Sequence, residues 1–112
     1  MKFLKPNVIV ILLIGIGVHV YSLVVTPYPF PEEPDWSHYA HLAAYIVALY
    51  AVLKLQAQSI GKILYALAII YPFYFHARLL FGELQGAINI QNMVACVAIV
   101  VFLPAGLFLF RK

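Results

Sequence analysis

The chain has 112 residues, of which 65% are hydrophobic and 10% are charged, and its formal net charge is +3. About a quarter of the residues in soluble domains are charged, so this composition excludes an ordinary soluble domain. The few cations are scattered along the chain, which argues against a basic patch for nucleic-acid binding. With Cys96 as its one cysteine, the chain cannot form an internal disulfide.

The length of the chain sets the number of membrane spans. A bilayer core about 30 Å thick requires about 20 apolar residues per helix, and four such helices use nearly the whole chain. Residues 1–112 are therefore predicted to form one transmembrane domain, an all-α integral membrane bundle of four transmembrane helices. The predicted helices cover residues 7–25, 36–55, 62–80 and 88–110.

The first helix begins after Pro6, which suits the first turn because its missing N–H would be unpaired there in any case. Lys2 and Lys5 before an apolar run also resemble the start of a signal peptide. The run from Val8 to Val25 is longer than a typical signal-peptide core, and no small-x-small cleavage site follows it. We therefore expect an uncleaved signal anchor.

The connection to the second helix contains four prolines between residues 26 and 35, which predict an extended loop. The second helix begins near Trp36, with Asp35 or Ser37 available as its N-cap. A polar turn at residues 56–61 then reverses the chain.

The third helix contains Pro72, which is expected to kink it. The fourth helix begins between Gln85 and Asn89, and Pro104 and Gly106 are expected to bend or loosen its last turns.

The charges divide between the two sides of the predicted bundle. One side carries six of the seven Lys and Arg residues: Lys2, Lys5, Lys54, Lys62, Arg111 and Lys112. The other side carries Arg78 and all four acids: Glu32, Glu33, Asp35 and Glu83. Because Lys and Arg accumulate on the cytoplasmic side of membrane proteins, both termini are predicted to be cytoplasmic. The expected location is the inner (cytoplasmic) membrane, as a multi-pass protein with the lipid bilayer as its surroundings.

Polar residues recur at helical spacing in the outer half of each span. They are His19, Ser22 and Thr26; Ser37, His38, His41 and Tyr45; His76 and Glu83; and Gln85, Asn89, Asn92 and Cys96. Polar side chains are costly against lipid, so these stripes are expected to turn toward one another. The result would be an outward-facing polar cavity, closed below by apolar inner halves. Alternatively, the stripes are hydrogen bonds that hold the helices together.

The predicted binding residues centre on His41 and Glu83, as a hydrogen-bonded or ion-paired couple. The other members of the predicted site are Tyr45, Gln85, Asn89 and Asn92. The sequence assigns no catalytic residue, metal ligand or cofactor, and a binding role is favoured over an enzyme.

Three chemistries remain open as alternatives to binding alone. One is bis-histidine haem ligation by His19 with His41 or His76. The second is a metal site formed by His38, His41, His76 and Glu83. The third is acid–base chemistry by His41 and Glu83 on a lipid headgroup.

Three segments resemble the VanZ-like family of integral membrane proteins. Ser37-His-Tyr-Ala-His41-Leu-Ala-Ala-Tyr45 resembles the segment that opens the family's second helix. Gly82-Glu-Leu-Gln85 is similar to the Glu and Gln pair at the outer end of its third helix, and Asn92-Met-Val-Ala-Cys96 to the Asp-x-x-x-Asn pattern of its last. The chain departs from the family at Ser37, Asn92 and Cys96, so it is identified as a divergent member.

The resemblance implies a cell-envelope protein associated with low-level resistance to glycopeptide antibiotics such as teicoplanin. On this interpretation the polar cavity binds a lipid headgroup or a protein partner. A second hypothesis is an accessory subunit packed into a larger respiratory or photosynthetic membrane complex. A third is a haem- or quinone-binding membrane anchor.

Overall fold

The computed structural model describes residues 3–24, 35–80 and 90–110, without the side chains of residues 35 and 90–92. The described residues form four α-helices: α1 (Leu4–Val24), α2 (Asp35–Lys54), α3 (Ser59–Leu80) and α4 (Ile90–Ala105). A 3-10 helix, η2 (Gly106–Leu109), continues α4 directly. Within the described ranges there is no β-strand. The prediction of an all-α chain with four helices is confirmed, with boundaries within a few residues of those expected.

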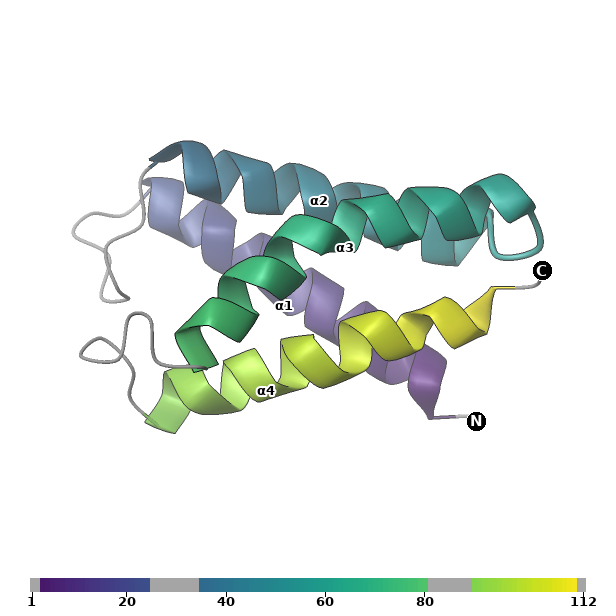
Figure 1. Cartoon of the computed structure of the whole chain (residues 1–112). Helices are drawn as coiled ribbons and strands as arrows, with labels where there is room; N and C mark the ends of the chain where they lie inside the picture. The colour runs from purple at the N-terminus through teal and green to yellow at the C-terminus, as the bar shows by residue number, and fades with distance from the viewer. Residues whose placement is uncertain (1–2, 25–34, 81–89, 111–112) are drawn as a thin grey trace.

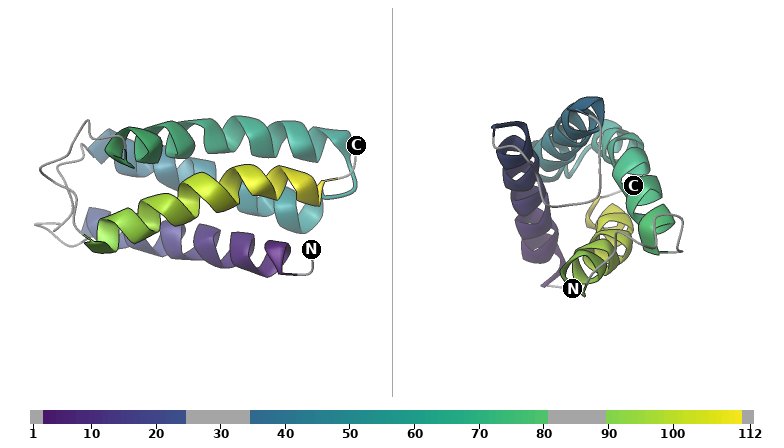
Figure 2. Two further views of the ribbon diagram at one scale, coloured as in Figure 1. Left: turned by 60° about the horizontal axis from the view of Figure 1, so that its bottom comes forward. Right: turned by 90° about the vertical axis from the view of Figure 1, so that its left-hand side faces the viewer.

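The helices run alternately up and down the bundle (Figure 1). Seen from one end, they surround a common centre in chain order, with α1 diagonal to α3 (Figure 2). The α2–α3 turn and both chain termini lie at one end of the molecule (Figure 1). The principal-axis extents of 41 × 26 × 20 Å describe an elongated bundle.

Lys5, Lys54 and Lys62 lie in the terminal turns of α1, α2 and α3 on the side of the α2–α3 turn, and we call this the lysine end. Arg78 lies near the opposite end of α3. For the cations that the structure describes, the predicted division into two sides therefore agrees with the fold. Lys2, Arg111, Lys112, Glu32, Glu33 and Glu83 lie outside the described residues.

The three prolines that the structure describes lie where the sequence predicts. Pro6 lies in the first turn of α1, and Pro72 is inside α3, which continues through it. Pro104 is the second-to-last residue of α4, and the chain tightens from α to 3-10 geometry at Gly106. Because proline removes a backbone donor, it weakens the helix at this point, and short 3-10 turns are frequent at such ends.

The core is apolar in the half of the bundle nearer the lysine end, which we call the lysine half. Val8, Leu12, Val52 and Leu103 are fully buried there. The predicted apolar inner halves contain one buried polar group. Tyr65 is buried there, and its hydroxyl donates a hydrogen bond of 2.6 Å to the backbone carbonyl of Leu103. The tyrosine hydroxyl requires a partner once it is buried, and the end of α4 supplies one.

The outer surface of the bundle is apolar as well. Large hydrophobic side chains are exposed on all four helices, among them Leu13, Ile46, Leu67 and Val97. Two helices, α1 and α3, are long and apolar enough to cross a membrane, and only 22% of the most apolar stretch of each is buried. α4 together with η2 contains a shorter apolar stretch, Met93–Leu109.

Candidate functional site

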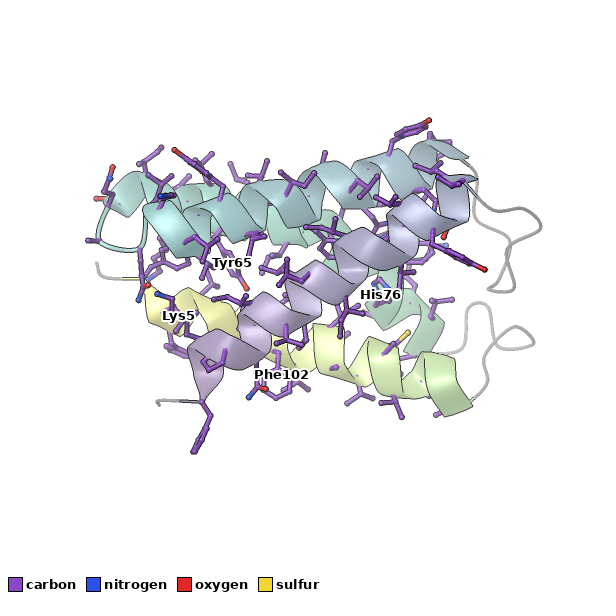
Figure 3. All side chains as sticks on the ribbon, turned by 180° about the vertical axis from the view of Figure 1, so that it is seen from behind. Lys5, Tyr65, His76 and Phe102 are labelled. Atoms are coloured by element: carbon purple, nitrogen blue, oxygen red, sulfur yellow. The ribbon has the colours of Figure 1, made fainter. Side chains whose placement is uncertain are left out.

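Four histidines gather in the half of the bundle opposite the lysine end, and we call them the histidine cluster: His19 from α1, His38 and His41 from α2, and His76 from α3. His19, His38 and His41 are buried, with exposed fractions of 7%, 3% and 0%. His76 is half-buried. Figure 3 shows His76 and Tyr65 in opposite halves of the bundle. Three helices thus bring titratable side chains to one level of the fold.

His19 and His38 join α1 to α2 directly. Their Nδ1 atoms lie 2.8 Å apart in a hydrogen bond, and their ring centroids are 5.0 Å apart. One Nδ1 must carry the proton and the other must accept it. The two helices are therefore linked by a direct polar contact.

His41 lies at the centre of the cluster. Its ring stacks on that of His19, with centroids 4.5 Å apart and an interplanar angle of 2°. Its Nδ1 lies 2.9 Å from the carbonyl oxygen of Ser37, one turn earlier in α2. A carbonyl only accepts, so Nδ1 of His41 carries the proton and donates it.

α3 covers His41 from the other side with three rings. Tyr71, Phe75 and His76 have centroids 4.9, 5.0 and 5.5 Å from that of His41. Nδ1 of His76 donates to the carbonyl oxygen of Pro72 at 2.7 Å, which fixes its proton in the same way. His41 is therefore held by aromatic and imidazole rings of α1, α2 and α3.

Ser37 does not act as the N-cap suggested by the sequence. Its hydroxyl is buried and lies 2.8 Å from the hydroxyl of Tyr71, so it links α2 to α3. Ser22 is buried as expected, but its hydroxyl donates to the carbonyl of Val18 in its own helix. Short hydroxyl side chains commonly bond to the preceding turn, which spacing alone does not exclude.

The predicted binding residues are described only in part. His41 and Tyr45 are buried together, with ring centroids 5.7 Å apart. Glu83, Gln85 and Asn89 lie outside the described residues, so their predicted contact with His41 stays a prediction. Asn92 lies in α4, but its side chain is also outside the description.

The expected arrangement of polar stripes is confirmed for α1 and α2 in that His19, Ser22, Ser37 and His41 are buried. Cys96 of the predicted fourth stripe is buried too. The rings of the histidine cluster pack directly against one another. The described part of the cluster is therefore a packed group of polar side chains in the bundle interior.

The geometry bears on the metal and haem alternatives. Among the described side chains, no group of three or more His, Cys, Asp or Glu is arranged to hold a metal ion. Bis-histidine ligation would need two imidazoles that face each other across the bundle. The rings of His19 and His41 are instead stacked face to face, with an interplanar angle of 2°.

Sequence reasoning missed the direct bond between His19 and His38 and the part played by Tyr71 and Phe75. Helical spacing indicates which side chains share a face, but not the height at which two helices are paired. The i, i+4 spacing of Tyr71 and Phe75 beside His76 is the one signal that could have indicated these two rings.

Comparisons of the chain with family models, curated proteins and solved structures return no match. The resemblance to VanZ-like proteins therefore remains a prediction from the three segments described above.

Proposed function

We propose that this chain is a small VanZ-like protein of the cell envelope with four membrane spans and both termini in the cytoplasm. In this account α2 and α4 cross the bilayer together with α1 and α3, and the histidine end faces outward. α1, α2 and α3 contain 20 to 22 residues and are therefore about 30 Å long, which matches the hydrocarbon core. α4 contains 16 residues and is continued by the four residues of η2. The exposed apolar surface supports insertion into the membrane. The three described lysines at one end support the orientation with that end in the cytoplasm.

The proposed activity is non-enzymatic binding of a lipid headgroup beneath the outer membrane surface. One observation carries it: α1 and α2 bury three histidines, and α3 adds the half-buried His76 at the same level of a bundle whose other half is mostly apolar. Ionisable residues within membrane segments are costly, and by default they indicate a functional site. His76 is the half-buried member of the cluster, so a ligand would meet its ring first.

A neutral imidazole accepts a hydrogen bond from a hydroxyl or ammonium group, and an imidazolium donates one to a phosphate. Both kinds of group occur in lipid headgroups. Glu83, Gln85, Asn89 and Asn92 belong to the same proposed site through the family resemblance.

The headgroup proposal is tested by native mass spectrometry of the purified protein in a mixture of phosphatidylethanolamine, phosphatidylglycerol and cardiolipin. We expect one retained lipid per chain, with occupancy reduced several-fold in His76→Ala. Val47→Ala, an exposed position of α2, is the matched control and should retain the lipid. Equal occupancy in His76→Ala and the unmodified protein would contradict the proposed site.

The VanZ-like role is tested separately, in a glycopeptide-sensitive bacterium that expresses the chain. Expression should lower teicoplanin sensitivity, and His41→Gln and Glu83→Ala should abolish this effect at unchanged membrane abundance. Unaltered sensitivity in both variants would remove the support for a role in resistance.

An accessory subunit of a larger membrane complex is the second candidate. The observation that favours it is that the polar groups bond to one another, as in the His19–His38 and Ser37–Tyr71 pairs. Such pairs are typical of structural contacts between membrane helices. Purification from native membranes in mild detergent distinguishes the two: a subunit copurifies with stoichiometric partners, whereas the binding protein is isolated alone with lipid.

A further inference from the structure

The turn between α2 and α3 is compact and holds two lysines close together at the lysine end (Figure 1). α2 ends at Lys54, and Lys62 lies in the first turn of α3. The N–H of Gln58 donates to the carbonyl oxygen of Leu55 at 3.0 Å and so closes the turn. A Cβ atom built on the buried Gly61 would clash with that same carbonyl oxygen and would lie 2.8 Å from its carbon. The backbones at positions 55 and 61 are therefore in direct contact, and each lysine is the chain neighbour of one of these positions.

No described side chain neutralises these two charges. Lys54 and Lys62 are exposed, and Lys5 of α1 lies half-buried at the same end of the bundle. Among the side chains that the structure describes there is no Asp or Glu, so none of them forms an ion pair with a lysine. Like charges held near one another repel, and an anion placed between them relieves the repulsion. The charge pattern of this turn therefore favours a negatively charged partner.

The surface beside the two lysines is apolar. On α2, Tyr50 and Val47 are exposed about one and two turns before Lys54. On α3, Ile63 and Leu67 are exposed directly after Lys62. Each exposed cation thus lies at the end of an exposed apolar stretch of helix. A phospholipid has the matching arrangement, with a phosphate at the level of the charges and acyl chains along the helix.

We propose that Lys54 and Lys62, which we call the lysine pair, bind the phosphate of an anionic phospholipid in the cytoplasmic leaflet. The inference rests on the membrane insertion proposed above and not on the histidine cluster. An ammonium group binds phosphate as a point charge, and lysines just cytoplasmic of a membrane span attract anionic lipids. Phosphatidylglycerol and cardiolipin have net negative charge, whereas the cation of a phosphatidylcholine or phosphatidylethanolamine headgroup is repelled by the lysines.

The exposure of the lysine pair sets the kind of binding. Ion pairs between exposed groups are weak, so the lipid exchanges with the surrounding bilayer. The site is therefore measured as local enrichment of anionic lipid in a bilayer, and not as retention of lipid after purification.

The enrichment is tested by fluorescence quenching of the full chain in vesicles that contain phospholipids with brominated acyl chains. Tyr50→Trp in a Trp36→Phe background reports on the lysine pair. Trp36 is the one tryptophan of the chain, is exposed at the opposite end of α2, and reports on that end in the unmodified protein. At the Tyr50→Trp reporter we expect an association constant several-fold higher for brominated phosphatidylglycerol than for brominated phosphatidylcholine.

The dependence on charge is tested in the same reporter. Lys54→Gln with Lys62→Gln should remove the preference for phosphatidylglycerol, and Lys54→Arg with Lys62→Arg should retain it. Arg78→Gln, at the opposite end of α3, is the control and should leave the preference unchanged. The preference should also fall in 1 M salt, where the screening length is about 3 Å.

Two failures of this experiment have different meanings. If Trp36 is quenched but the Tyr50→Trp reporter is quenched equally by both lipids, the lysine pair does not select anionic lipid. The same conclusion follows if the Gln double variant keeps the preference. If brominated lipid quenches neither tryptophan, the proposed membrane insertion is contradicted, and the lysine pair with it.

Discussion

Gly15 and Gly17 lie two residues apart in α1 and face different surroundings. A Cβ atom built on Gly15 would lie 2.7 Å from Cε2 of Tyr45, whereas one on Gly17 would meet no atom within 4 Å. Tyr45 is buried, with 1% of its side chain exposed, so its ring cannot swing aside. The missing side chain at Gly15 thus allows α1 to approach the aromatic ring that supports His41.

Gly15→Ala is therefore expected to destabilise the bundle by about 1–3 kcal/mol, since overpacking forces the ring or the helix to shift. Gly17→Ala is the matched control and should be neutral or stabilising by up to about 1 kcal/mol, because alanine favours a helix. Thermal unfolding of both variants in mild detergent measures the difference. Equal unfolding temperatures for the two variants would show that α1 and Tyr45 are not in close contact.

At the scale of elements, the end of α4 depends on a contact with α3. The Tyr65 hydroxyl donates to the carbonyl of Leu103, and a Cβ atom at Gly106 would clash with that same hydroxyl. Tyr65 also packs against Phe110, with ring centroids 5.2 Å apart. Tyr65 therefore packs directly against the backbone where α4 changes to η2, at Leu103 and Gly106.

Tyr65→Phe should cost about 0.5–1.5 kcal/mol, the usual value for a lost intramolecular hydrogen bond. Gly106→Ala should cost more, because the added methyl group meets a fully buried ring. The double variant should lose less unfolding free energy than the sum of the losses in the two single variants, because removal of the hydroxyl relieves part of the clash. Thermal unfolding of the three variants measures this coupling, and strictly additive effects would count against the contact.

A second contact between elements lies at the lysine end. The Gln56 side chain donates from Nε2 to the carbonyl oxygen of Leu109 at 3.0 Å, which ties the α2–α3 turn to η2. Gln56→Leu should lower the unfolding free energy by about 0.5–1.5 kcal/mol through loss of this bond. Gln58→Leu, at an exposed position of the same turn, is the control. Equal effects of the two changes would indicate that the bond does not contribute.

For the whole molecule, the sequence was sufficient to predict four helices, their order and the side on which the described lysines lie. Those features follow from apolar length, proline positions and charge, which act locally. The partners of the polar residues were not predictable, because they depend on the relative heights of neighbouring helices. His19 was expected to share a face with Ser22, but nothing in its spacing indicated that it would bond to His38. Tyr65 was overlooked because a single tyrosine in an apolar run gives no periodic signal.

The central claim is that four helices cross the membrane with the histidine end outside. Its most direct test is the reaction of single cysteines with a membrane-impermeant maleimide in intact cells, in the Cys96→Ser background. We expect Glu32→Cys and Gly86→Cys to react in intact cells, and Gln58→Cys to react only after lysis. Labelling of Gln58→Cys in intact cells, or protection of Glu32→Cys until lysis, would contradict the proposed orientation.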